Sequence, residues 1–176
     1  SKLWGLEPST VFLNHGSFGA APIAVLEEQT RIRNEMEEDP VYFVEKKMND
    51  LWQKSILELS KFLNADPEGM VFVTNATMGV NTILRSLKLS PGDEIIVPDH
   101  AYQACRNAID FVTERSGART VIVPVPFRVD DESEIIDPIL SAVSDRTVLA
   151  MIDTVSSPTG IRMPFEILVL ELQNKG

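Results

Sequence analysis

The sequence predicts an α/β domain with a mostly parallel sheet that helices cover on both faces. The first reason is a set of short, almost wholly apolar runs at Met70–Val73, Glu94–Val97, Thr120–Val123 and Val148–Ile152. Strands that are buried on both faces have this composition. The second reason is that helical stretches separate the runs. The third is that turn residues, such as Ser90-Pro91-Gly92-Asp93, precede a run.

The helices between these runs are predicted from their amphipathic spacing. We expect them at Met78–Leu87, Tyr102–Thr113 and Glu134–Val143, with another from Pro164 to the last residue. Residues 67–176 are therefore assigned to the α/β domain.

Residues 1–66 are expected to form a separate helical segment. A first helix is predicted at Ile23–Glu38, and Asp39-Pro40 ends it because the residue before proline avoids the helical region. A second helix is predicted at Phe43–Leu63. Its inner face is predicted from the apolar residues Leu51, Ile56, Leu59 and Phe62.

The composition is that of a soluble globular protein, with 44% hydrophobic and 24% charged residues among 176. The net charge of −10 argues against nucleic acid and anionic membranes as partners. The single cysteine, Cys105, excludes a disulfide within the chain and is interpreted as a small buried side chain. No run approaches a membrane span of about 20 apolar residues. The first ten residues lack the apolar region of a signal peptide, so we expect a cytoplasmic protein.

Ligands of parallel α/β sheets bind beyond the carboxyl ends of the strands, and Asn75-Ala76-Thr77 stands at the first such end. Small residues that open a helix expose backbone N–H groups, which attract an anion such as a phosphate group, and a threonine adds a hydroxyl donor. The alternative is plain helix capping by Asn75 or Thr77. The glycine patterns of P-loops and dinucleotide-binding folds are missing here.

Polar residues follow two other predicted strands. In Asp99-His100-Ala101-Tyr102, an imidazole or a phenol could stack on a planar cofactor, or Asp99 could simply cap the next helix. The stretch from Thr154 to Gly160 is rich in hydroxyl groups, although such residues also make ordinary loops. Asp153, just before it, could be a buried acid partner. Near the N-terminus, Phe12–Gly19 combines two glycines with polar and aromatic groups, and an ordinary loop is again the alternative.

Five motifs in this order resemble the class V aminotransferase family of pyridoxal-phosphate enzymes, of fold type I. The nearest branch is the isopenicillin N epimerase-like group, which is related to cysteine desulfurases. The motifs are Phe12-Leu13-Asn14-His15-Gly16-Ser17-Phe18-Gly19, Asp39-Pro40-Val41-Tyr42-Phe43, Thr74-Asn75-Ala76-Thr77, Asp99-His100-Ala101-Tyr102 and Ser156-Ser157-Pro158-Thr159-Gly160.

The resemblance implies a cofactor, pyridoxal 5'-phosphate, and a role for each motif. Ala76 and Thr77 would hold its phosphate group, and either His100 or Tyr102 would stack on its ring. Thr154 and Ser157 would contact the pyridine ring and its 3-oxygen. The resemblance places Asn14, His15 and Ser17 on the substrate side, and it calls for no metal site.

The resemblance also implies that two residues of the family's chemistry are missing from this sequence. One is the lysine that forms a Schiff base with the cofactor, and the other is the aspartate that pairs with the pyridinium nitrogen; both come later in relatives. We therefore expect the N-terminal part of a longer enzyme, with an incomplete three-layer large domain over 67–176. Such a part is expected to be inactive alone and to form a homodimer, because an unpaired sheet edge tends to pair.

The expected reaction breaks a bond at Cα or Cβ of a small-molecule amino acid, in an epimerase, a C–S lyase or desulfurase, or an aminotransferase. The alternative is a non-catalytic module from the same family that binds phosphate or serves in assembly. A third, weaker possibility is an unrelated nucleotide-binding domain, against which the missing glycine pattern argues.

Overall fold

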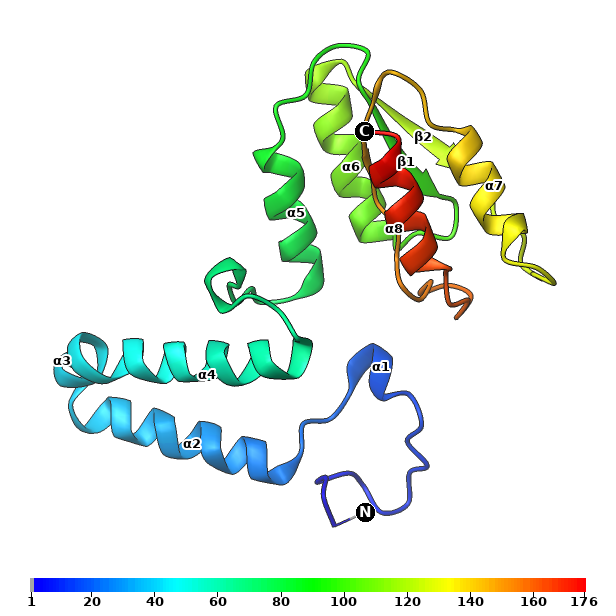
Figure 1. Cartoon of the computed structure of the whole chain (residues 1–176). Helices are drawn as coiled ribbons and strands as arrows, with labels where there is room; N and C mark the ends of the chain where they lie inside the picture. The colour runs from blue at the N-terminus through cyan, green and yellow to red at the C-terminus, as the bar shows by residue number, and fades with distance from the viewer. Residues whose placement is uncertain (1) are drawn as a thin grey trace. The chain divides into compact units, whose positions relative to one another are not determined.

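The computed structural model describes residues 2–176 and divides into two compact units (Figure 1). The first unit ends at Phe72 and the second begins at Val73. Ser1, the first residue of the predicted helical segment, lies outside the described residues. No helix of the described part of the chain is both long enough and apolar enough to cross a membrane.

The first unit is built on a helical hairpin. Its elements are α1 (His15–Phe18), α2 (Ile23–Glu38), α3 (Pro40–Tyr42), the π-helix η1 (Phe43–Lys47), α4 (Met48–Leu63) and the 3-10 helix η2 (Pro67–Gly69). α2 ends before Asp39, as the sequence predicts, and the Asp39 Oδ1 accepts a hydrogen bond of 3.1 Å from the backbone N–H of Tyr42. α4 then runs back along α2 (Figure 1).

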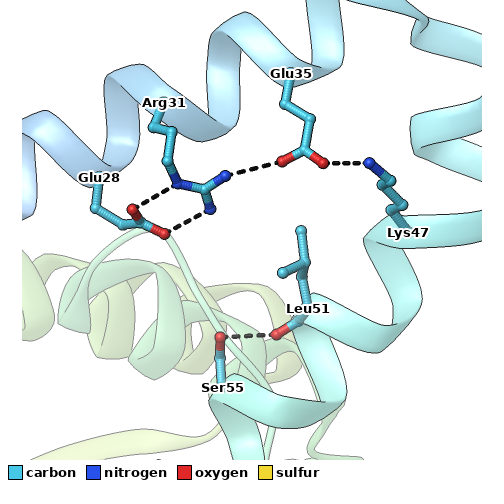
Figure 2. Close-up of polar contacts among 6 residues, drawn as sticks. All are labelled: Glu28, Arg31, Glu35, Lys47, Leu51 and Ser55. Atoms are coloured by element: carbon cyan, nitrogen blue, oxygen red, sulfur yellow. Dashed lines mark hydrogen bonds and ion pairs between the residues drawn. The ribbon is translucent and has the colours of Figure 1, made fainter.

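Charged side chains join the two arms of this hairpin (Figure 2). The Glu35 carboxylate accepts hydrogen bonds from Arg31 on its own helix, at 3.1 Å, and from Lys47 of η1. Arg31 also donates two hydrogen bonds to Glu28. These partners lower the pKa of Glu35, chiefly through the hydrogen bond from Lys47. Farther along, the Ser55 hydroxyl donates to the Leu51 carbonyl within α4 (Figure 2).

Few apolar side chains of the first unit are buried. The prediction that Phe62 lies on the inner face of α4 is wrong. Among the described residues of this unit, the buried hydrophobic side chains are Phe43 and Ile56. Phe62 is 84% exposed, because it lies in the last turn of α4, where the left-handed Asn64 ends the helix. The described residues of this unit therefore bury little apolar surface.

The strand predicted at Met70–Val73 does not form, and this prediction is wrong. A strand needs a neighbour to pair its backbone, and no described segment pairs with this run. Val71 is 80% exposed, and the Phe72 ring makes an edge contact with Trp52, with ring centroids 5.2 Å apart. One apolar side chain of this run therefore packs against another side chain, although the run forms no strand.

The second unit confirms the predicted α/β architecture, with three strands. Its elements are α5 (Ala76–Ser86), β1 (Glu94–Pro98), α6 (Gln103–Ser116), β2 (Arg119–Val123), α7 (Ser133–Ser141), β3 (Thr147–Ala150) and α8 (Phe165–Asn174). The strand order is β2-β1-β3, and both pairings are parallel. The central strand β1 is buried along its whole length.

Alternate residues of β1 face the two helical layers. Ile95 and Val97 belong to a cluster with Leu84 of α5 and Ile109 of α6. Ile96, between them, belongs to the opposite cluster, whose other buried members are Val123, Val125, Ile135, Ile139, Met163 and Leu168. Successive strand side chains point to opposite faces, so the apolar run fills two cores at once. The result is a three-layer unit with helices on both faces of the sheet.

Candidate functional site

The start of α5 is fixed by Asn75. Its backbone is extended, and its side-chain Oδ1 accepts a hydrogen bond of 2.8 Å from the backbone N–H of Met78. The Asn75 carbonyl accepts from the N–H of Gly79 at 3.1 Å. Of the two capping residues considered from the sequence, Asn75 is therefore the cap.

Capping leaves hydrogen-bond donors at the same helix end. Among the described residues, nothing accepts from the backbone N–H groups of Ala76 and Thr77 or pairs with the Thr77 hydroxyl. Ala76 is exposed and Thr77 is half-buried, so hydrocarbon does not cover these groups. The positive end of the helix dipole lies at the same place. This donor set suits an oxyanion such as a phosphate group.

His100 lies in the turn that follows β1. Asp99, beside it, ties this turn to the end of β2. Its N–H donates to the Val123 carbonyl at 2.9 Å, and its Oδ1 accepts from the N–H of Val125 at 3.0 Å. The His100 side chain is only 15% exposed, and its Nε2 lies 3.8 Å from Asp99 Oδ1.

Two hydroxyl groups from the loop after β3 meet His100. The Ser156 hydroxyl donates to the His100 carbonyl at 2.9 Å, and the Thr159 hydroxyl donates to Ser156 Oγ at 3.0 Å. Thr159 Oγ1 also lies 3.4 Å from His100 Nδ1. The carboxyl ends of β1 and β3 are neighbours in the sheet, which is why residues so distant in sequence meet here.

The other residues predicted at this edge are more open to solvent. Tyr102 is 46% exposed, and its backbone N–H donates to Asp153 Oδ2 at 3.2 Å. Thr154 and Ser157 are exposed, and their side chains have no hydrogen-bond partner in the described part of the chain. Cys105 is buried, as predicted; burial raises the pKa of its thiol, and the charge of Asp153 adds to this rise.

All of these positions belong to one end of the second unit. In Figure 1, α5 and α6 run side by side, and their N-terminal ends face the same end of the unit as the carboxyl end of β1. The structure joins His100 to Ser156 and Thr159 directly. It shows no hydrogen bond between Thr77 and these residues within residues 2–176.

The residues predicted on the substrate side lie in the first unit. Asn14 Oδ1 accepts from the backbone N–H of Ser17 at 3.1 Å and so caps α1. The His15 ring contacts the rings of Trp4 and Phe12, with centroid distances of 5.4 and 4.8 Å. Within residues 2–176, no group of three or more His, Cys, Asp and Glu side chains is arranged to hold a metal ion.

Sequence reasoning did not single out Ser156 and Thr159. Both lie in the hydroxyl-rich stretch from Thr154 to Gly160, for which the family resemblance implies roles for Thr154 and Ser157 instead. Burial distinguishes them, since Ser156 is 3% exposed whereas Ser157 is exposed. One signal in the sequence is Gly160, whose left-handed backbone at φ 71° closes the turn in which its N–H donates to the Ser156 carbonyl.

Comparisons with known proteins bear on the family and the fold of the chain. The family model described as Aminotransferase class-V matches residues 22–176. The chain is 29% identical to isopenicillin N epimerase of Streptomyces clavuligerus, over 97% of this chain and 43% of that protein. It is 30% identical to L-cysteine desulfhydrase of Arabidopsis thaliana, over 93% of this chain and 39% of that protein.

A solved structure shares the fold. It is a variant of C-DES with glycine covalently linked to its PLP cofactor, and it superposes with a TM-score of 0.79 at 19% identity. The match covers 98% of this chain and 45% of the solved one. This likeness confirms the predicted fold class, and the chain spans less than half the length of these relatives.

Proposed function

The chain belongs to the class V aminotransferase family, and on that premise we propose that it forms part of a pyridoxal-phosphate-dependent enzyme acting on an amino acid. The observation that carries this proposal is the start of α5. There, two backbone N–H groups and the Thr77 hydroxyl remain available to one anion, at the sheet edge where α/β folds bind ligands.

The residues of this edge suit a phosphorylated, planar cofactor. Ala76 and Thr77 would hold the phosphate group, and the His100 imidazole would lie against the ring. Thr154 and Ser157, whose hydroxyls are exposed, would donate to polar atoms of the ring. Bound there, pyridoxal phosphate would supply an electron sink for a carbanion next to nitrogen.

His100 is preferred to Tyr102 as the residue that stacks on the ring. The Ser156 and Thr159 hydroxyls hold its position, whereas the Tyr102 side chain is 46% exposed and its hydroxyl forms no hydrogen bond within the described chain. A held ring loses less conformational freedom when a ligand binds than a free one does.

The substrate is proposed to be a small-molecule amino acid, with the reacting bond at Cα or Cβ. Support comes from the relatives, which include an epimerase and a desulfhydrase, and from the C-DES structure with its bound glycine. Asn14, His15 and Ser17 are proposed to contact this substrate. Epimerisation, C–S bond cleavage and aminotransfer all remain within the proposal.

Replacing Thr77 by valine is expected to weaken binding of pyridoxal 5'-phosphate about tenfold. The reason is that one hydrogen bond to a charged group contributes about 1.5 kcal/mol. Binding is measured by calorimetric titration of the chain, with pyridoxal, which lacks the phosphate group, as a second ligand. The substitution should leave the weaker affinity for pyridoxal unchanged.

Thr82→Val is the matched control for this experiment. Thr82 lies on the same helix, but its hydroxyl already donates to the Met78 carbonyl at 2.9 Å. Its removal should leave both affinities unchanged. Equal affinity of the original chain and the Thr77 variant for pyridoxal 5'-phosphate would overturn the phosphate site.

We also infer that the lysine that holds the cofactor covalently is not among the seven lysines of residues 1–176. In the second unit, Lys88 lies in a hollow with the last turns of α5 and α6, and Lys175 lies beside Thr147 at the amino end of β3. Both are therefore at the opposite end of the sheet from Thr77. As a second measurement on the titrated sample, borohydride reduction and peptide mapping should find no single lysine that carries the cofactor stoichiometrically.

A homodimer in the cytoplasm is part of the proposal. Large apolar side chains are exposed in the stretch before α2, where Val11, Leu13 and Phe18 are each more than 80% exposed. Exposed apolar groups of this kind are typical of protein interfaces. The single free thiol, Cys105, is compatible with a reducing compartment. Sedimentation velocity at micromolar concentration should give the mass of a dimer, and a stable monomer would contradict this.

A further inference from the structure

We propose that Ser156 and Thr159 are positioning residues that hold the His100 imidazole in one orientation and in one tautomer, with the proton on Nδ1. The contact of this ring with a cofactor rests on the proposed function. The orientation and the tautomer rest only on the hydrogen bonds of the chain itself.

The first step is the direction of the Ser156 hydrogen bond. Ser156 is 3% exposed, and its hydroxyl lies 2.9 Å from the His100 carbonyl. A carbonyl oxygen can only accept, so Ser156 must donate its one hydrogen there. Its lone pairs then remain to accept from another group.

The second step is the direction of the Thr159 hydrogen bond. Thr159 Oγ1 lies 3.0 Å from Ser156 Oγ and must donate to it, because the Ser156 hydrogen is already committed. Thr159 therefore has only lone pairs for His100 Nδ1, at 3.4 Å. A lone pair on oxygen pairs with an N–H group, so Nδ1 carries the proton in the neutral ring.

The opposite side of the ring does not compete for that proton. Nε2 lies 3.8 Å from Asp99 Oδ1, which is beyond hydrogen-bond distance. The same Asp99 oxygen already accepts from the backbone N–H of Val125. In the neutral ring, Nε2 therefore keeps its lone pair. It can accept a hydrogen bond or a proton from a group in the site, and it cannot donate one.

The packing around His100 and the backbone of the Ser156–Ile161 loop both support this hydrogen-bond arrangement. The hollow that His100 and Ser156 share with Asp153 and Met163 has no room for a water molecule beside these side chains. The loop itself is held by its backbone. The Gly160 N–H donates to the Ser156 carbonyl at 2.8 Å, and the Ser156 N–H donates to the Ile161 carbonyl at 2.9 Å. Removing a hydroxyl should therefore change the ring without dismantling the loop.

Nitrogen NMR of the full chain with ¹⁵N-labelled histidine tests the tautomer. The chain has two histidines, His15 and His100, so His15→Phe assigns the spectrum while keeping a ring against Trp4 and Phe12. At alkaline pH, where histidine side chains are neutral, the ring ¹⁵N shifts of His100 should show a protonated Nδ1. A protonated Nε2 in the unaltered chain would overturn the proposal.

Three substitutions separate positioning from a merely structural role. Ser156→Ala frees the Thr159 hydrogen to turn toward Nδ1, so His100 should change to the Nε2-protonated tautomer. Thr159→Val removes the acceptor and should give the same change, whereas Thr159→Ser should restore the protonated Nδ1. Ser157→Ala, which removes an exposed hydroxyl next to Ser156, should leave the tautomer as it is.

If Ser156→Ala does not fold, the comparison of Thr159→Val with Thr159→Ser still tests the proposal. The same tautomer in Thr159→Val and Thr159→Ser would overturn the proposal. No cofactor takes part in this experiment, so its result is independent of the pyridoxal phosphate titration. A failed titration with the expected tautomers would refute the proposed function alone, and the reverse result would refute the positioning role alone.

Discussion

Replacing Leu168 by alanine is expected to lower the free energy of unfolding of the second unit by about 3 kcal/mol. Leu168 is fully buried at the start of α8, in the cluster that contains Ile96 of β1 and Ile139 of α7. Its side chain therefore joins two helices to the central strand. The substitution removes apolar contacts and leaves a cavity, because surrounding elements of this layer cannot collapse fully into the space.

Urea unfolding followed by circular dichroism measures this loss, with Leu170→Ala as the matched control. Leu170 lies on the same helix but is 58% exposed, so its removal should change the free energy by no more than about 0.5 kcal/mol. Equal losses in the two variants would show that the α8 face identified here is not the buried one.

The fold of the second unit could be predicted because its runs encode burial directly. The β1 run is buried from Glu94 to Pro98, as the apolar composition of a strand covered on both faces predicts. The run at Met70–Val73 is also apolar but forms no strand. Whether a strand forms depends on a partner for its backbone, and composition carries no information about pairing.

Some residues of the candidate site could likewise be proposed from the sequence, and others could not. The sequence could propose Thr77 and His100 as candidates, because strand ends and helix starts are local features. It did not identify Ser156 and Thr159, since their roles arise only where the loops after β1 and β3 meet. Residues that act through another residue are defined by tertiary contacts, and their types alone, a serine and a threonine in a loop, are too common to distinguish them.

The second large effect on stability is expected from a buried charge at the amino ends of the strands, opposite the candidate site. Glu94 begins β1 and is 2% exposed. Its carboxylate accepts hydrogen bonds from Arg119, the first residue of β2, including one of 3.1 Å from Nε. It also accepts one of 2.8 Å from the Ser144 hydroxyl, just before β3. One carboxylate therefore connects the starts of all three strands.

These partners lower the pKa of Glu94 below its ordinary value of 4.5. The hydrogen bond from Arg119 has the largest effect and the one from Ser144 the next, while burial acts in the opposite direction. A folded-state pKa below the unfolded one means that the charged form favours folding. This contribution is fully present above pH 4.5 and is lost as the pH falls through the lower, folded value.

Glu94→Gln is therefore expected to lower the free energy of unfolding by about 1.5 kcal/mol at neutral pH. The figure lies at the low end for hydrogen bonds to a charged group because the Arg119 side chain is 69% exposed and solvent screens its charge. As the pH falls below 4.5, Glu94 of the unaltered chain is protonated first in the unfolded state, and in the folded state only when the pH falls through the lower, folded pKa. The difference between the two proteins should shrink over this range. Urea unfolding at several pH values measures both effects.

Glu166→Gln provides the control for a carboxylate that forms an ion pair without burial. Glu166 accepts from Arg162 one turn away at 2.8 Å, but both side chains are at least 70% exposed. Exposed pairs of this kind contribute little to stability, so this substitution should change the free energy only slightly at any pH. A pH-independent loss in Glu94→Gln would instead mean that the ionisation of Glu94 is not what stabilises the starts of the strands.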